Sequence, residues 1–275
     1  MKRVLTAIII LPFLIASILI SWLQPLFVLL IAAALLIGLL EFRKLARKRG
    51  MKPVDEAMFL GAAGLFVVFY LNDPSQEVLT LQLIVAILIL MTAVTLAATA
   101  FRGAPFDAMI SSAGATILGV LYVVLLGAHL VALRSSFPQQ LAAHLLSFFF
   151  LVIMGADVGA YYVGRTFGKH KLAPTISPGK TWEGVAGGLL AGLLLAGVAH
   201  FWFFRNLPLK WALPLGALMT LVGLAGDLTE SALKRSVGAK DAANLLPGHG
   251  GMLDRLDSLL FNAPLIYYFA RIYFQ

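Results

Sequence analysis

Long apolar segments recur along this chain, and most are about as long as a helix needs to cross a lipid bilayer. Hydrophobic residues make up 60% of the 275 residues and charged residues only 12%, against about 25% charged residues in an ordinary soluble domain. A membrane-spanning helix needs about 20 consecutive apolar residues. The sequence therefore predicts an all-α, polytopic integral membrane protein.

The apolar segments predict about nine transmembrane helices in a single membrane-embedded domain, residues 1–275. They lie at about residues 4–22, 25–41, 57–71, 78–99, 108–133, 141–163, 182–204, 211–234 and 259–273. The first resembles a signal peptide, but its apolar run is long for one and no small-residue cleavage site follows, so we expect it to be retained. The segments at 57–71 and 259–273 are short for a full crossing. The N-terminal spans cover about 4–133, and the part from about 141 to 275 carries the candidate functional residues.

The basic residues are unevenly distributed between the connecting segments. If the N-terminus is inside, the inner segments (1–3, 42–56, 100–107, 164–181 and 234–258) hold 17 of the 21 Lys and Arg residues. Positive charge concentrates on the cytoplasmic side of membrane proteins, so we predict a cytoplasmic N-terminus and an external C-terminus. The net charge of +8 is then explained by the orientation of the protein in the membrane and by contact with anionic lipids. We therefore expect no nucleic-acid partner. The six basic residues from Arg43 to Lys52 are interpreted as a membrane-surface anchor rather than a specific site.

Charged residues are dense in one stretch, residues 226–258. Asp227, Glu230, Ser231 and Lys234 stand at spacings of three, four and seven, so a helix places them on one face. A carboxylate that meets lipid costs about 2.5–3.5 kcal/mol on insertion scales. We therefore expect Asp227 to face a polar cavity.

The same stretch continues into the sequence PGHGG, which contains too much glycine and proline to be helical. Its backbone N–H groups, which include those of Gly250 and Gly251, are available to bind an anion. His249 is the histidine that we connect with the site. Asp254 and Asp257 follow, on the same side of a helical turn. Oxygen ligands of this kind suit Mg²⁺, which proteins usually hold with one or two carboxylates and substrate phosphates.

A second polar stretch, residues 164–184, carries several basic and hydroxyl side chains. They are Arg165, Lys169, Lys171, Ser177, Lys180 and Thr181. Pro178 and Gly179 are expected to form a turn. Lysines beside a glycine-containing turn suit a phosphate-binding loop, although any basic inner loop has a similar composition.

Asp157 is an isolated carboxylate in the sixth apolar segment. It lies roughly 9 Å from the predicted cytoplasmic end of that helix. It either pairs with Arg165 or lines a pocket, and we favour the pocket because carboxylates within membranes usually mark function.

Gly184, Gly188 and Gly192 recur at intervals of four residues in the seventh apolar segment. Small residues at this spacing allow two helices to approach closely. We expect this face to pack inside the monomer, and a homodimer interface is the alternative.

The charged stretch contains the pattern S-x-x-K-R-x4-K-D-x5-P-G-H-G-G-x-x-D-R-x-D. It resembles the signature of the phosphatidate cytidylyltransferase family, also called CDP-diacylglycerol synthases. The pattern is filled by Ser231, Lys234, Arg235, Lys240, Asp241, Pro247 to Gly251, Asp254, Arg255 and Asp257. The run SPGKTWEG at residues 177–184 also resembles an element of this family, and the chain's length and hydropathy fit it end to end. One departure concerns local loop geometry: Ala242 and Ala243 stand where members often have a small residue and then glycine.

The resemblance implies a reaction and helps to assign the residues of the site. CTP and phosphatidic acid would react to give CDP-diacylglycerol and pyrophosphate at the cytoplasmic face of a bacterial-type inner membrane. From the charge pattern, Asp227, Asp254 and Asp257 are our candidates for binding Mg²⁺, alone or with a second cation. The catalytic set would comprise these three residues and Lys234, Arg235, Lys240, Asp241, His249 and Arg255. Substrate contacts would come from Ser177, Lys180, Ser231, Gly250 and Gly251, and Asp157 joins them as a pocket-lining residue.

Two other classes of membrane protein also use intramembrane carboxylates. A secondary transporter is expected to show repeats and broken helices near the midplane, whereas the charges here collect at one face. A CDP-alcohol phosphotransferase also uses several aspartates and a metal, but its D-G-x-x-A-R signature is absent because Leu228 follows Asp227. Neither composition nor spacing identifies cytosine or diacylglycerol, which rest on the resemblance alone.

Overall fold

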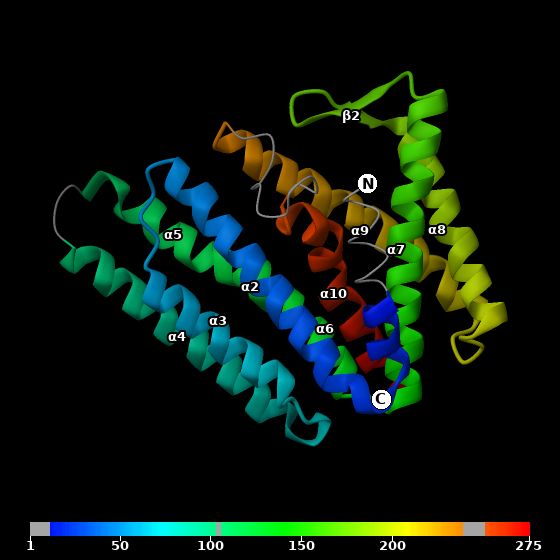
Figure 1. Ribbon diagram of the computed structural model, residues 1–275, viewed down its shortest axis with the longest axis horizontal. Helices are drawn as coiled ribbons and strands as arrows, with labels where there is room; N and C mark the ends of the chain where they lie inside the picture. The colour runs from blue at the N-terminus through cyan, green and yellow to red at the C-terminus, as the bar shows by residue number, and fades with distance from the viewer. Residues whose placement is uncertain (1–11, 103–105, 239–250) are drawn as a thin grey trace.

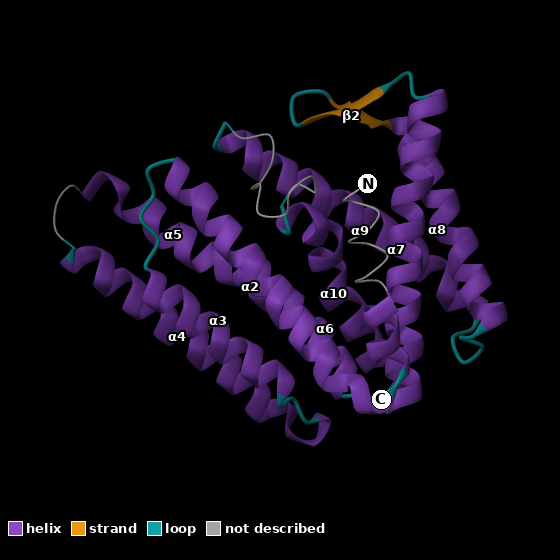
Figure 2. Ribbon diagram, in the orientation of Figure 1, coloured by secondary structure: helices purple, strands orange, loops and turns teal. Residues whose placement is uncertain are grey.

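The computed structural model describes residues 12–102, 106–238 and 251–275, which are almost entirely helical (Figure 2). The α-helices are α2 (Gln24–Lys48), α3 (Asp55–Tyr70), α4 (Glu77–Phe101), α5 (Met109–Gly119), α6 (Leu126–Ser135), α7 (Gln139–Phe167), α8 (Trp182–Trp202), α9 (Leu209–Ser236) and α10 (Leu253–Phe274). Short 3-10 helices cover Ser21–Leu23, Pro74–Gln76 and Phe106–Ala108, a π-helical turn covers Val120–Leu125, and residues 12–19 are also helical. A helix satisfies its own backbone polar groups, which is what apolar segments in lipid require.

Six helical stretches are long and apolar enough to cross a membrane. They are Ser21–Lys48, Glu77–Phe101, Phe106–Ser135, Gln139–Phe167, Trp182–Trp202 and Leu209–Ser236. The predicted all-α membrane architecture is therefore confirmed. The helix α3 has only 16 residues, and α10 carries three charged residues in its first two turns, so neither is among the six. The predicted segment at 4–22 lies partly outside the described residues, and nine crossings stay a prediction.

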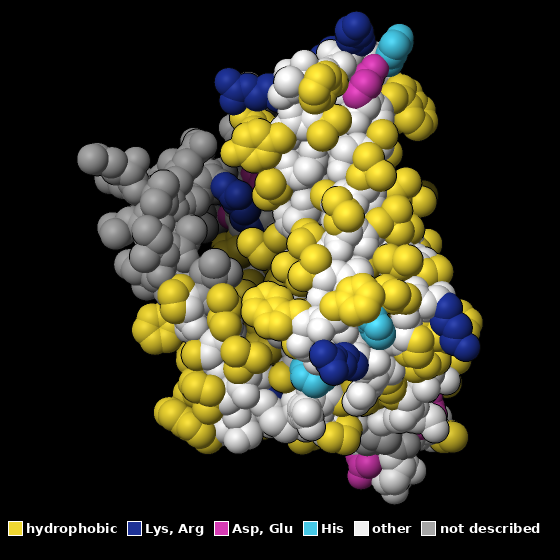
Figure 3. Space-filling model, turned by 90° about the vertical axis from the view of Figure 1, so that its right-hand side faces the viewer, with side chains coloured by type: hydrophobic (Ala, Val, Ile, Leu, Met, Phe, Trp, Pro, Cys, Tyr) yellow, Lys and Arg dark blue, Asp and Glu magenta, His cyan; other side chains and the backbone are white. Residues whose placement is uncertain are grey.

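The outer face of α8 shows how such a helix meets lipid. Trp182 at its start and Trp202 at its end are both exposed, and exposed Leu190 and Leu194 lie between them. Tryptophan is enriched where a protein meets the two bilayer surfaces, and 21 residues of α-helix span about 30 Å. Figure 3 shows hydrophobic side chains over most of this side, with charged ones gathered mainly toward its ends. The helix therefore matches the bilayer in length and in the position of its aromatic residues.

The helix α2 runs beyond the predicted apolar segment at 25–41 and ends at Lys48. Lys and Arg are good helix formers, and positive charge stabilises a helix C-terminus. Arg43 and Arg47 both form ion pairs with Asp55 Oδ2, each at 2.7 Å. The basic run is therefore helical as far as Lys48, and it also ties α2 to the first turn of α3.

The all-α prediction missed one small hairpin. The strands β1 (Lys171–Ala173) and β2 (Ser177–Thr181) pair in antiparallel fashion, with Lys171 opposite Thr181 and Ala173 opposite Ser177. The segment is too short and too rich in proline and glycine to continue α7 as a helix. Pairing the two strands satisfies backbone groups that a helix would otherwise satisfy.

The turn of this hairpin lies earlier than predicted. The Ile176 N–H donates to the carbonyl oxygen of Ala173 at 3.2 Å, and Pro174 occupies the second turn position, where its fixed φ is favoured. The predicted turn at Pro178 and Gly179 is wrong, because both residues belong to β2. A strand with one unpaired edge tolerates proline.

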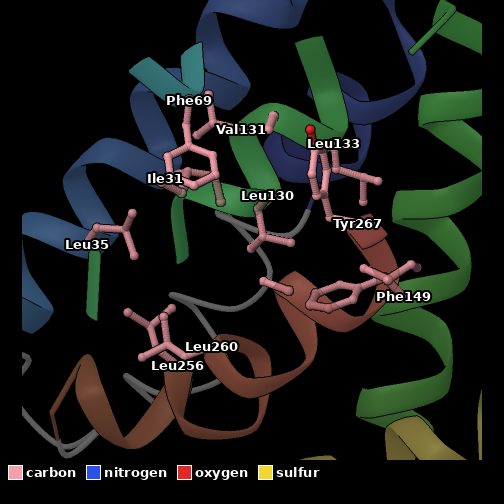
Figure 4. Close-up of a cluster of buried hydrophobic side chains, with 14 of the residues drawn as sticks. Ile31, Leu35, Phe69, Leu130, Val131, Leu133, Phe149, Leu256, Leu260 and Tyr267 are labelled. Carbon is pink, nitrogen blue, oxygen red and sulfur yellow. The ribbon is translucent and has the colours of Figure 1, made fainter. Parts of the chain in front are cut away.

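The helix α10 occupies the centre of the bundle. It packs against α9 and α6 and lies between the group α2–α6 and the group α7–α9 (Figure 1). Leu256, Leu260 and Tyr267 of α10 are buried with Leu130 of α6 and Phe149 of α7 (Figure 4). Side chains from both groups thus meet on α10, and this core fixes the helix that carries two of the predicted site aspartates.

The connecting segments gather at two opposite ends of the bundle (Figure 1). At one end, Arg102 donates to the carbonyl oxygen of Lys52 at 2.8 Å. At the other, Asn72 donates to Ser136 Oγ at 2.9 Å, and the side-chain amide of Gln275 donates to the carbonyl oxygen of Ser136 at 3.3 Å. Segments predicted to share one side of the membrane are therefore neighbours.

We predict that Lys171 and Gln275 lie on opposite sides of the membrane. The chain has no cysteine, so the variants Lys171→Cys and Gln275→Cys each carry a single cysteine. Labelling of that cysteine can be measured with a membrane-impermeant maleimide. In intact cells only Gln275→Cys should react, and both variants should react after permeabilisation. Labelling of both variants in intact cells would contradict the arrangement.

Candidate functional site

Two side-chain contacts fix the base of the hairpin on α8. Thr181 Oγ1 accepts a hydrogen bond from the Gly184 N–H at 3.1 Å, which caps the helix. Glu183, in the first turn of α8, accepts hydrogen bonds from the backbone N–H groups of Lys169 and His170 at 3.1–3.3 Å. These contacts therefore hold the hairpin, which precedes α8, in a defined direction over the end of α7.

The glycine face of α8 allows close contact with two neighbouring helices. A Cβ at Gly184 would lie 2.9 Å from the carbonyl oxygen of Ala160, and one at Gly188 would lie 3.0 Å from that of Ala156. Gly192 is buried and meets α9 instead. Only glycine permits this approach at the first two positions. The prediction that these glycines pack inside the monomer is confirmed.

A cavity of about 760 Å³ lies between α7, α8, α9, the start of α10 and the hairpin. This is within the range of about 300–1,000 Å³ for small-molecule sites. Its charged lining residues are Asp157, Arg165, Lys171, Lys180, Asp227, Asp254 and Asp257, and Ser177 also lines it. Ile153 and Met219 line it further along α7 and α9. The cavity therefore joins a charged end to an apolar region within the helices.

The charge of Asp227 is compensated from the hairpin. Lys180 Nζ lies 2.5 Å from Asp227 Oδ2, and both side chains keep part of their surface exposed. Because Lys180 immediately precedes the residue that caps α8, its side chain reaches α9 from a fixed backbone. Two segments far apart in the sequence thus converge on one ion pair in the cavity wall.

Asp157 lines the cavity, as predicted. The alternative partner, Arg165, instead donates to the Tyr161 hydroxyl at 3.0 Å, and within the described residues no ion pair joins it to Asp157. Asp257 also lines the cavity, and its Oδ1 accepts from the Ser258 N–H at 2.6 Å. Asp157, Asp227 and Asp257 thus contribute carboxylates to one space from three different helices.

Lys234 lies behind the cavity and binds two carboxylates. Its Nζ is 2.6 Å from Glu230 Oε2 and 2.5 Å from Asp254 Oδ1. The Glu230 side chain is 1% exposed and the Lys234 side chain 13%, so the pair is shielded from water. Asp254 Oδ2 accepts from the Gly251 N–H at 2.7 Å. This cluster connects α9 to the start of α10.

The other residues of the predicted site lie around the cavity or outside the described structure. Ser231 is buried, with its hydroxyl 3.5 Å from Asp227 Oδ1. Arg235 Nε donates to the carbonyl oxygen of Ile176 at 3.2 Å, which ties α9 to the hairpin turn. Arg255 is exposed. Lys240, Asp241, His249 and Gly250 lie outside the described residues.

The donor groups can be compared with the needs of a divalent cation. Within residues 12–102, 106–238 and 251–275, no three His, Asp or Glu side chains form a group that could hold a metal. Two carboxylates are sufficient when substrate phosphates supply further oxygens. Asp227 and Asp257 fit this role because both line the cavity. Asp254 also lines the cavity but fits this role less well, since its oxygens are held by the shielded Lys234 at 2.5 Å and by the Gly251 N–H at 2.7 Å. The partners of Asp227 are weaker, namely the partly exposed Lys180 and the Ser231 hydroxyl at 3.5 Å.

Three glutamates near the site were not predicted as functional residues. Glu230 binds Lys234, Glu183 supports the hairpin, and Glu41 of α2 is fully buried against the start of α10. A signal was available, because the chain has only 13 acidic residues and an acidic residue in an apolar segment usually has a specific partner. Glu41 was overlooked because it stands directly before the basic run that begins at Arg43.

The fold and the cavity define an integral membrane protein with a charged binding site at one end of its helices. The chain belongs to the Cytidylyltransferase family, whose profile it matches over residues 1–273. This confirms the family resemblance seen in the sequence. The cavity with a charged mouth and an apolar interior is therefore a feature of a member of this family.

Curated relatives carry the name phosphatidate cytidylyltransferase. One from Staphylococcus saprophyticus is 35% identical over 231 residues, which cover 84% of this chain and 85% of the relative. One from Bacillus subtilis is 33% identical over 231 residues, 81% and 82% of the two chains. One from Haemophilus influenzae is 47% identical over 131 residues, 46% and 45% of the two chains.

The two lysines near the site should differ in their effect on stability. Lys234→Met leaves the buried Glu230 and the partly buried Asp254 without their cation, and loss of the partner of a buried charge typically costs about 3–5 kcal/mol. Lys180→Met removes a partly exposed pair, typically worth about 0.2–1 kcal/mol. We therefore expect a much lower unfolding midpoint in detergent for Lys234→Met only. Equal midpoints for the two variants would show that Lys234 is not the structural cation.

Proposed function

We propose that this protein is a phosphatidate cytidylyltransferase that converts CTP and phosphatidate into CDP-diacylglycerol and pyrophosphate. The proposal is supported by membership of the Cytidylyltransferase family and by the names of relatives that align over more than 80% of the chain. The observation on which it most depends is the cavity, which combines cationic side chains at a membrane surface with apolar walls inside the bundle.

This combination suits the two proposed substrates. Phosphatidate has an anionic headgroup on apolar chains, and CTP is a soluble polyanion. Met219 precedes Asp227 by eight residues on α9, about 12 Å along the helix. Headgroup chemistry at Asp227 would therefore take place beside apolar walls suited to the upper part of a lipid. Arg165, Lys171 and Lys180 offer positive charge to the phosphates at the same end.

The proposed reaction needs no strong base. A phosphate oxygen of phosphatidate attacks the α-phosphorus of CTP, a new P–O bond forms, and the bond to the β-phosphate breaks as pyrophosphate leaves. The nucleophile is already an anion, so the main obstacle is repulsion between two polyanions. Lys180 can exchange Asp227 for a phosphate oxygen, and Arg165 and Ser177 can orient phosphate groups in line. Positioning and charge stabilisation supply most of the rate in phosphoryl-transfer chemistry of this kind.

We further propose that Asp227 and Asp257 hold Mg²⁺, with Asp254 supporting them through its bonds to Lys234 and Gly251. When bound, the cation would neutralise charge on the phosphates. Asp254 was predicted as a third ligand, and its contacts favour this supporting role. Lys240, Asp241 and His249 stay predictions as residues that approach the nucleotide from the segment outside the described structure.

The membrane orientation belongs to the same proposal. We place the cavity on the cytoplasmic side of a bacterial-type inner membrane, where CTP is available, with nine crossings, the N-terminus inside and the C-terminus outside. The distribution of basic residues supports this, since 17 of 21 fall in segments assigned to the cavity side. Because the glycine face packs inside the monomer, it does not provide the surface for the alternative that we considered, a homodimer.

The test of the function is CTP-dependent pyrophosphate release by purified protein in the presence of phosphatidate, with dCTP, UTP and lysophosphatidate as comparisons. Within this assay Lys180→Ala should reduce turnover strongly, because the cation nearest the carboxylate wall is lost. Lys48→Ala changes an exposed lysine at the end of α2 and should have little effect. Equal effects of the two substitutions would indicate that Lys180 only anchors its loop, and no activity in the wild type would refute the function.

Changing each of the three aspartates to Asn should affect turnover in two variants and stability in the third. Asp227→Asn and Asp257→Asn remove a charge from the cavity wall and should each lower turnover at least about 100-fold, as expected for loss of transition-state charge stabilisation. Raising Mg²⁺ should partly restore them. Asp254→Asn should instead lower the unfolding midpoint, because Lys234 loses one of its two carboxylates. Near-normal turnover in both cavity-wall variants would contradict the proposed ligand set.

A further inference from the structure

Glu41 makes an unusual contact between two helices that are far apart in the sequence. It lies near the end of α2 and is 0% exposed. Its Oε1 accepts from the Met252 N–H at 2.9 Å, and its Oε2 accepts from the Leu253 N–H at 2.8 Å. Both oxygens of one buried carboxylate are thus used on the N-terminus of α10.

This contact answers a specific need of α10. The first N–H groups of a helix have no partner within the helix, and they carry the positive end of its dipole. Within the described residues, Met252 at the N-cap gives no side-chain cap. Glu41 satisfies two of these N–H groups, and Asp254 Oδ2 satisfies the preceding one, that of Gly251. The start of α10 is therefore held by two carboxylates, one from a distant helix.

The residues immediately after this cap belong to the site. Asp254 follows Leu253 directly and binds Lys234, and Asp257 lies one turn further, in the cavity wall. Leu253 and Leu256 pack close to Gly38 of α2, so the same face of α2 supports this turn through both polar and apolar contacts. Fraying of the first turn would move both aspartates.

We infer that Glu41 is a positioning residue for the cytidylyltransferase site. It does not line the cavity, and it acts by fixing the first turn of α10 so that Asp257 faces the substrate and Asp254 meets Lys234. The N-terminal helices therefore take part in the reaction through one carboxylate, although the cavity itself is built from α7–α10 and the hairpin. The effect on turnover depends on the proposed function, whereas the effect on α10 does not.

The experiment compares Glu41→Gln, Glu41→Asp and Glu41→Ala with a matched control, Glu56→Gln. Glu56 is also a glutamate at a helix N-terminus, in the first turn of α3, but it is exposed. Glutamine keeps the size of Glu41 but replaces one acceptor oxygen with an NH₂ group. We expect kcat to fall about 10- to 100-fold in Glu41→Gln, the loss typical when a partner that orients a site ligand is removed. KM for CTP should stay close to wild type, because the hairpin is unchanged.

Hydrogen exchange measured by mass spectrometry on the full-length protein gives a readout that does not need activity. Peptides covering residues 251–258 should exchange faster in Glu41→Gln and Glu41→Ala, while peptides from α8 stay as in wild type. Glu41→Asp retains both acceptors on a shorter side chain and should recover part of both kcat and protection.

Each outcome separates the inference from its alternatives. Unchanged exchange at residues 251–258, or turnover of Glu41→Gln equal to that of Glu56→Gln, overturns it. Faster exchange throughout the protein, with a lower unfolding midpoint and KM and kcat changed together, would mean that Glu41 is simply a stability residue, which also overturns it. If the wild type has no cytidylyltransferase activity, the proposed function fails, and the exchange measurement still decides whether Glu41 holds α10.

Discussion

The structure depends on one constraint: carboxylates held among apolar helices need partners that offset their negative charge. An ionised group without a partner is very costly in an apolar environment. Three arrangements meet this constraint: Lys180 with Asp227, Lys234 with Glu230 and Asp254, and the N–H groups of α10 with Glu41. Each joins segments that are distant in the sequence. Satisfying all three together leaves little freedom in how α2, α9, α10 and the hairpin are placed.

Small residues then determine where the cavity forms. Close approach of α7 and α8 along their glycine and alanine faces brings these two helices together as a pair. The pair meets α9 along Gly192, while the hairpin at the start of α8 reaches over toward Asp227. The cavity borders this contact, because Gly184 and Gly188 also line it beside the charged residues. Larger side chains at Gly184 or Gly188 would separate the helices and change the wall of that space.

The position of the cavity explains how a membrane-embedded protein can serve one soluble and one lipid substrate. Its charged residues come from the hairpin and from the neighbouring parts of the helices, where we propose that CTP enters. Its apolar residues lie further along the same helices, where we propose that the upper acyl chains of the lipid lie. Asp227 stands where these two regions meet, and its ion pair with Lys180 compensates both charges. In the proposed mechanism, phosphate groups replace Asp227 as the partner of Lys180.

The sequence by itself determined the class of the protein, the main helices and the family. Helices in lipid must satisfy their backbone locally, so apolar segments such as 78–99 and 211–234 predict α4 and α9 closely. It also indicated Asp157 and Asp227, because a carboxylate in an apolar segment stands out, and it indicated Asp257 and Lys180 through the charged stretch and the family resemblance. The structure places all four in the lining of one cavity. Only the tertiary structure decided how charges pair. Glu41 binds backbone groups 211 and 212 residues away, and Lys234 meets Asp254 rather than the cavity, since such contacts depend on which helices become neighbours in three dimensions. The turn at Pro174, instead of Pro178, was likewise decided by strand pairing, which a local pattern of proline and glycine does not specify.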